Sequence, residues 1–240
     1  MADATEQPRE RVRDLTRRLV AAHDPATTPA EELWGAQFDA GLAWIHFPEG
    51  RGGLGLPPDL QMVVDEELRA AGAPSNVLRN FMGVGMAGPT LVAHGTPEQQ
   101  ERLLRPLFTC EEIWCQLFSE PGAGSDLASL STRAEQDGDT WVVTGQKVWC
   151  SNGRVADKGI LLARTDPDAP KHKGISFFLV DMRAPGVETR PLRQLTGDSE
   201  FDEVFLDEVR IPDNDLVGPL HGGWGVAMST LTNERGHIGA

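Results

Sequence analysis

Residues 140–153 read TWVVTGQKVWCSNG, a run of β-branched and aromatic residues with the composition of a strand. Two similar runs follow at Gly159–Arg164 and Gly174–Asp181, and turn-forming residues separate them. Shorter strands are expected at 187–191 and 203–206. Because no helical pattern alternates with these runs, we predict an antiparallel β-barrel or sandwich over residues 112–221.

Helical periodicity precedes this β-domain and returns after it. Apolar residues recur at helical spacing from Pro8 to His23, and the sequences TPAE (28–31) and TPEQ (96–99) each offer a hydroxyl cap with a proline at the first helical position. Further helices are expected over 58–71 and 76–94, with a loop at 47–55. The predicted fold is therefore α+β and multidomain: an all-α N-terminal domain (1–111), the β-domain (112–221) and the start of a helical C-terminal domain (222–240).

Composition excludes several classes of function. The 240 residues carry 22 basic and 36 acidic side chains, a net charge of −14, which disfavours nucleic acid and anionic membranes as partners. No apolar run is long enough to span a bilayer and the N-terminus lacks a secretory pattern, so we expect a cytoplasmic protein. Three cysteines and six histidines lack metal-binding spacing, so we expect packing thiols and no metal site.

Two glycine-rich stretches differ in their context. The first, GVGMAG at 83–88, matches the dinucleotide fingerprint but has no strand before it, which favours small residues for helix packing. The second, QLFSEPGAGSD at 116–126, follows a strand-like run. Gly122 and Gly124 allow backbone N–H groups to approach an anion, and Ser119 and Ser125 add hydroxyls. Taken alone, such a stretch is a turn more often than a binding site.

A second block strengthens the functional interpretation. In residues 146–153, QKVWCSNG, a strand carries the aromatic ring of Trp149 and, two residues on, the hydroxyl of Ser151 on the same side. A flat redox heterocycle needs an aromatic plane with a nearby hydrogen-bond donor. Lysines near turns, such as Lys147 and Lys171, are instead expected to be solvated charges.

Together the two blocks resemble an acyl-CoA dehydrogenase. The family pattern Ser/Thr-Glu-x-x-Gly/Ala-Gly-Ser/Thr-Asp is met at residues 119–126, and the pattern Trp-x-Ser/Thr-Asn-Gly is met at residues 149–153. The resemblance to the family's N-terminal and middle domains runs from about residue 8 to the end of the chain. It implies bound FAD and oxidation of an acyl-CoA thioester to the trans-2-enoyl-CoA.

The resemblance also implies roles for individual residues. The strand Gln116, Leu117, Phe118 and Ser119 would present backbone groups and a hydroxyl to the flavin pyrimidine edge. Gly124 and Ser125 would lie where the flavin meets the thioester, with Ser125 serving the substrate. Trp149 would pack on the isoalloxazine, and Ser151 would donate near the flavin N5. Leu117-Phe118 is bulkier than the usual family pair. Cys150, which the resemblance also assigns to flavin binding, lies between Trp149 and Ser151 and stands where an aliphatic residue is common.

The reaction requires a base, because the weakly acidic α-proton must leave as hydride leaves the β-carbon. In relatives of the isovaleryl and long-chain type, this base is a Glu on the helix after the barrel, followed by an Arg that contacts CoA. Residues 233–236 read NERG at that place. Glu234 is therefore the candidate base and Arg235 the candidate CoA contact; the alternative is a solvated surface pair.

Several functional interpretations remain open. The leading one is a dehydrogenase that passes electrons to an electron-transfer flavoprotein and forms homo- or hetero-oligomers when complete; the missing helical domain is expected to weaken flavin binding and turnover in this chain. The alternatives are a flavin-dependent acyl-CoA oxidase or monooxygenase relative, and a non-catalytic subunit of a heteromeric dehydrogenase.

Overall fold

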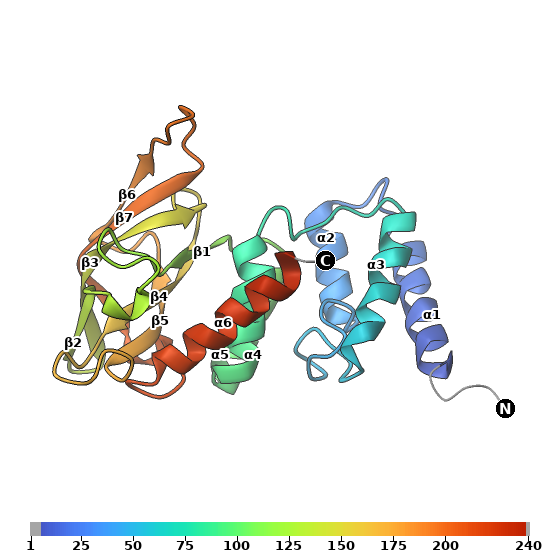
Figure 1. Ribbon diagram of the computed structural model, residues 1–240. Coiled ribbons are helices and arrows are strands. Elements are labelled where there is room, and N and C mark those ends of the chain that lie inside the picture. The colour runs from blue at the N-terminus through green and yellow to red at the C-terminus, as the bar shows by residue number, and fades with distance from the viewer. Residues whose placement is uncertain (1–5, 239–240) are drawn as a thin grey trace. The chain divides into compact units, whose positions relative to one another are not determined.

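The computed structural model describes residues 6–238 of the chain, which form two compact units (Figure 1). One unit contains the described residues up to Asn80 together with Gln100–Glu111. The other contains Phe81–Gln99 and the described residues from Glu112 onward. The fold class predicted from the sequence is confirmed, since helices come first, a mostly antiparallel sheet follows and a helix ends the chain.

The first unit is helical. It contains α1 (Glu6–Ala22), α2 (Ala30–Asp39), the 3₁₀ turn η1 (Pro58–Leu60), α3 (Gln61–Ala70) and most of α5 (Pro97–Phe108). Its core is aliphatic, because the apolar faces of α1 and α3 pack together around Val12, Val63 and Val64, all of them buried. The aromatic side chains of Phe38, Trp44 and Phe108 form edge-to-face and tilted contacts in the same unit.

Of the two helix starts predicted from the sequence, one has the expected side-chain cap and the other does not. At the start of α5, the Gln99 backbone N–H donates to the Thr96 hydroxyl at 3.2 Å, and the Gln99 side chain accepts from the Thr96 backbone N–H at 3.0 Å. This is the expected capping box. At the start of α2 the predicted Thr28 cap is wrong: the helix begins at Ala30 after Pro29, without a side-chain cap.

The helix predicted over 76–94 is wrong in its first turn. Residues 77–79 form a turn, and helical structure begins at Phe81, continues as the π-helix η2 (Met82–Ala87) and ends as α4 (Gly88–His94). The physical reason is tertiary: the Asn76 and Asn80 side-chain amides donate to the carbonyls of Phe108 and Leu107 at the end of α5. The GVGMAG stretch at 83–88 is therefore helical and buried, as its small residues suggested.

The second unit is built on an eight-stranded sheet with the order β6-β7-β3-β2-β4-β5-β8, and β1 pairs with β4. The strands are β1 (Trp114–Leu117), β2 (Arg133–Asp137), β3 (Thr140–Ser151), β4 (Lys158–Arg164), β5 (Ile175–Asp181), β6 (Val187–Leu192), β7 (Phe201–Pro212) and β8 (Leu216–Val217), with the 3₁₀ turns η3 (Leu127–Ser129) and η4 (Asp213–Asp215). Most pairs are antiparallel, but β1 runs parallel to β4, and β2 makes one parallel bridge to β4.

The core of this sheet contains alternate residues of its strands, including Leu117, Val143, Leu161, Phe178 and Val204. The last helix, α6 (Gly223–Ile238), lies alongside α4 (Figure 1), and its residues Val226, Ala227 and Thr230 are buried. Part of the apolar surface of α6 is therefore packed within the second unit. No helix in the range 6–238 has the length and apolarity needed to cross a membrane.

Candidate functional site

The glycine-rich segment after β1 forms a tight turn. Glu120 and Ala123 exchange two backbone hydrogen bonds of 3.0 Å each, which close the turn over Pro121 and Gly122. A Cβ placed on Gly122 or Gly124 would meet no atom within 4 Å. The backbone of this turn is therefore open on its outer side, where a ligand could approach its N–H groups.

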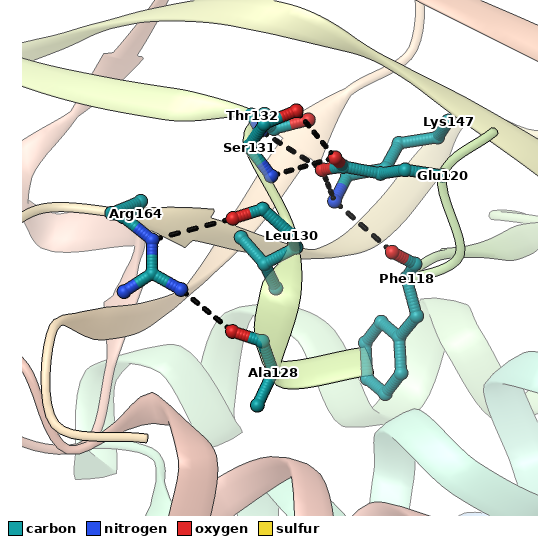
Figure 2. Close-up of polar contacts among 8 residues, drawn as sticks. All are labelled: Phe118, Glu120, Ala128, Leu130, Ser131, Thr132, Lys147 and Arg164. Carbon is teal, nitrogen blue, oxygen red and sulfur yellow. Dashed lines mark hydrogen bonds and ion pairs between the residues drawn. The ribbon is translucent and has the colours of Figure 1, made fainter. Parts of the chain in front are cut away.

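A buried ion pair fixes the turn to β3 (Figure 2). The Lys147 ammonium, which is fully buried, lies 2.8 Å from the Glu120 carboxylate and donates to the Phe118 carbonyl at 3.1 Å. The same carboxylate accepts from the Ser131 backbone N–H and hydroxyl at 2.7 and 2.8 Å, and from the Thr132 backbone N–H at 2.9 Å. One carboxylate thus joins three segments of the second unit.

The charge state of Glu120 follows from these contacts. Burial by itself raises the pKa of this carboxyl, but the Lys147 ammonium and the hydrogen bonds from Thr132 and Ser131 outweigh it and lower the pKa to about 2. Glu120 is therefore ionised at neutral pH. The expectation that Lys147 is a solvated charge is wrong, because its strand position faces a carboxylate rather than water.

A β-bulge interrupts the regular alternation of side chains at the end of β3. The pairing with β7 shifts between Lys147 and Cys150, and Trp149 has a φ of 61°, which is rare for a bulky residue. The Trp149 side chain is 56% exposed, and its ring meets the edge of Phe201 at a centroid distance of 5.7 Å. Backbone strain of this kind concentrates at functional sites, which makes Trp149 a candidate ligand contact.

The exposed turn, the end of β3 and the helix α6 meet around one cavity of about 490 Å³. It is lined by Gln116, Phe118, Ser119, Gly124, Ser125, Leu127, Val148, Trp149, Trp224, Met228, Leu231 and Glu234. The two sequence blocks and the candidate base therefore border the same space.

Four candidate residues lie elsewhere. Leu117 and Cys150 are fully buried members of the sheet core and do not line the cavity. Burial raises the pKa of the Cys150 thiol to about 12. Ser151 is half-buried and does not line the cavity. Arg235 is exposed on α6 and does not line it either, although Glu234, its neighbour, does.

Residues that the sequence did not single out complete the cavity and its rim. Trp224, Met228 and Leu231 recur at helical spacing on α6 and form an apolar stripe along the cavity. The loop between β4 and β5 contacts both the glycine-rich segment and α6. Lys171 lies 2.6 Å from an Asp126 carboxylate oxygen, and the His172 ring lies 4.8 Å from the Trp224 ring.

Solved structures share this architecture and define its class. A structure described as "Tcur3481-Tcur3483 steroid ACAD G363A variant" is 32% identical and has a TM-score of 0.73, over 94% of this chain and 62% of that chain. The ChsE4-ChsE5 complex from Mycobacterium tuberculosis is 30% identical with a TM-score of 0.69, over 97% of this chain and 60% of that chain. The fold is thus that of acyl-CoA dehydrogenases, in which a helical part precedes a β-domain.

Sequence comparison shows the family itself. The models "Acyl-CoA dehydrogenase, N-terminal domain" and "Acyl-CoA dehydrogenase, middle domain" match residues 2–111 and 115–209. This chain belongs to the acyl-CoA dehydrogenase family. It is 52% identical over 216 residues to acyl-CoA dehydrogenase FadE34 and 48% identical over 197 residues to acyl-CoA dehydrogenase IpdE1, both of Mycobacterium tuberculosis. These matches cover 90% and 82% of this chain, which spans 30% and 51% of the two relatives.

Proposed function

We propose that this chain supplies the flavin and acyl-CoA contacts of an FAD-dependent acyl-CoA dehydrogenase, which converts an acyl-CoA to its trans-2-enoyl-CoA. The observation that carries the proposal is the single cavity bordered by both sequence blocks and by Glu234. Two findings support it: the chain belongs to the family, and three separate segments of the chain line the same cavity.

The residues present fit a flavin. The indole of Trp149 offers an exposed aromatic plane, the turn at Gly122–Gly124 leaves backbone uncovered, and Ser119 and Ser125 bring hydroxyls to the same cavity. When bound, FAD supplies the chemistry of accepting the β-hydrogen as hydride. The segment Gln116–Ser119 would face the flavin. The Glu120–Lys147 pair would hold that segment against β3.

Glu234 is the proposed base. Glu234 lines the cavity, and its carboxylate has no hydrogen-bond partner among the described residues, so its oxygens are available to accept the α-proton of the substrate. The proton moves to Glu234 as hydride leaves the β-carbon, and a double bond forms between the two carbons. Arg235, exposed on the same helix, is proposed to meet the CoA phosphates outside the cavity.

The substrate proposed here carries a ring. Similar proteins include cyclohexane-1-carbonyl-CoA dehydrogenases of Syntrophus aciditrophicus and Geobacter metallireducens, 32% and 34% identical, as well as the steroid ACAD. The apolar stripe of Trp224, Met228 and Leu231 would contact such a ring. We further propose an electron-transfer flavoprotein as electron acceptor. Association with a second acyl-CoA dehydrogenase chain is supported by the two-chain composition of the ChsE4-ChsE5 complex.

An equilibrium titration with FAD tests the cofactor assignment. Quenching of flavin fluorescence should saturate for the wild-type chain. Trp149→Leu should weaken binding by about fivefold, since an aromatic stack contributes about 1 kcal/mol. Leu78→Ser, a change at a side chain that is 92% exposed in the other unit, is the control and should leave binding unchanged. Equal binding by wild type and Trp149→Leu would contradict the assignment.

A further inference from the structure

A second cavity, of about 650 Å³, opens in the second unit and shares no lining residue with the first. Its wall includes apolar surface from Trp141, Pro167 and Leu220. Its polar groups include two guanidinium groups, Arg133 and Arg164, and the imidazole of His221, together with the Glu135 carboxylate. The proposed dehydrogenase chemistry uses none of these residues.

Arg164 brings an uncompensated positive charge to this cavity. Its guanidinium donates to the carbonyls of Leu130, Ala128 and Lys171 at 3.3, 2.8 and 3.2 Å (Figure 2 shows the first two). Carbonyls satisfy its hydrogen bonds but carry no charge, and among residues 6–238 no carboxylate lies within ion-pair distance of it. In a chain of net charge −14, an unpaired guanidinium beside a cavity favours an anionic ligand.

Arg133 is the second cation, and it is weakly held. Its only ion pair within the described range is with Glu135 at 4.0 Å, and its side chain is 64% exposed. A pair at that distance in solvent contributes little. An oxyanion entering the cavity could therefore replace Glu135 as the partner of Arg133.

A closed ring of hydrogen bonds sets the tautomer of His221. The His221 backbone N–H donates to the Ser176 hydroxyl at 2.9 Å, Ser176 and Thr165 hydroxyls lie 2.7 Å apart, and the Thr165 hydroxyl lies 2.8 Å from His221 Nδ1. If Nδ1 carried the proton and donated to Thr165, the Thr165–Ser176 contact would use only one of the two hydroxyl protons, and the other would have no acceptor within the ring.

Only Nδ1 as an acceptor satisfies every group within the ring. Ser176 then donates to Thr165, Thr165 donates to Nδ1, and the imidazole proton resides on Nε2. Nε2 has no partner among the described residues, so it remains a donor at the cavity wall. His221 also has a φ of 62°, a strained conformation for a residue with a side chain, which is a feature that clusters at ligand sites.

We propose that this cavity binds a small organic oxyanion, a carboxylate or phosphate ester attached to a flat apolar body. Arg133 and the Nε2–H of His221 hydrogen-bond the oxyanion, and Arg164 adds attraction. The apolar body packs against Pro167 and Leu220, whose side chains are accessible at the cavity wall. This site is independent of the proposed dehydrogenase function, because no residue is shared between the two cavities.

Calorimetric titration of the full chain with benzoate, phenyl phosphate and inorganic phosphate tests the proposal. Saturable binding of benzoate or phenyl phosphate is expected, and which of them binds identifies the oxyanion; inorganic phosphate should bind at least about tenfold more weakly, because it lacks the apolar body. Arg133→Gln should weaken binding by about tenfold. The control is Arg190→Gln, which removes an arginine of similar exposure paired with Glu188.

Two measurements test the proposal. The first is the titration, which overturns it if neither organic anion binds saturably or if Arg190→Gln loses as much affinity as Arg133→Gln. The other comes from long-range ¹H–¹⁵N NMR of the imidazole, which needs no ligand: an Nδ1-protonated His221 in the free chain would contradict the donor that the site requires. The expected spectrum shows protonation on Nε2, and Thr165→Val should remove that preference.

Discussion

Replacing Lys147 by methionine should destabilise the protein strongly, because it leaves a buried carboxylate without its cation. The Glu120 side chain is 4% exposed and the Lys147 side chain 0%, so water cannot replace the lost partner. Breaking a buried pair from one side costs about 3–5 kcal/mol. A carboxyl whose pKa falls from 4.5 to about 2 on folding is stabilised by about 3 kcal/mol, which gives the same magnitude.

A double-mutant cycle separates the interaction energy of the Glu120–Lys147 pair from other effects of each substitution on stability. Urea unfolding at pH 7, followed by circular dichroism, would compare Lys147→Met, Glu120→Gln and the double variant with wild type. The double variant should be more stable than the sum of the single losses implies, by about 2 kcal/mol, because neither charge is then left buried alone. Additive losses, or a Lys147→Met loss below about 1 kcal/mol, would refute the inference that the pair joins the turn to β3.

The pH dependence has a definite sign. Glu120 has a lower pKa in the folded chain than in the unfolded chain, so its stabilisation is fully present above about pH 4.5 and is lost as the pH falls towards 2. The stability difference between wild type and the double variant should therefore be constant from pH 7 to pH 5 and shrink below that. A difference that persists unchanged down to pH 2 would contradict the assigned ionisation of Glu120.

Three further outcomes are expected. The cysteines of the folded chain should resist a thiol reagent at mildly alkaline pH and react only after unfolding. Burial raises the pKa of all three thiols, those of Cys110, Cys115 and Cys150, and that of Cys110 to about 11. Gly145→Ala should lower stability by about 1–3 kcal/mol in urea unfolding, since its Cβ would lie 2.7 Å from the Thr132 Cα, whereas Gly122→Ala, with open space around it, should be neutral. Phe201→Ala should weaken FAD binding several-fold in a fluorescence titration by releasing the ring of Trp149, whereas Phe205→Ala, on the same strand, should not.

Local sequence patterns predicted those elements that local physics determines. The β-branched runs gave β3, β4 and β5 because alternate side chains fill one core, and TPEQ gave the start of α5 because its capping box involves only neighbouring residues. The helical spacing after Gly223 likewise gave α6. Glu234 could be placed near the site only through the family resemblance, since its approach to Trp149 depends on how α6 packs.

Tertiary contacts decided the features that the sequence did not reveal. The Glu120–Lys147 pair joins residues 27 positions apart on different elements, and nothing near Lys147 in the sequence distinguishes a buried lysine from a solvated one. The turn at 77–79 replaces a predicted helix because Asn76 and Asn80 bond to the end of α5, far along the chain. The bulge that turns Trp149 outward depends on its register with β7.

Anaerobic mixing of the FAD-loaded chain with cyclohexane-1-carbonyl-CoA tests the central claim most directly. The visible absorption of the flavin should bleach as the acyl group is oxidised, and Glu234→Gln should slow that bleaching at least about a hundredfold while FAD binding is retained. Glu66→Gln, at an exposed position of α3, should bleach as wild type does. Absence of bleaching by a chain that holds FAD, or equal rates for wild type and Glu234→Gln, would contradict the assignment of this cavity as the site of dehydrogenation.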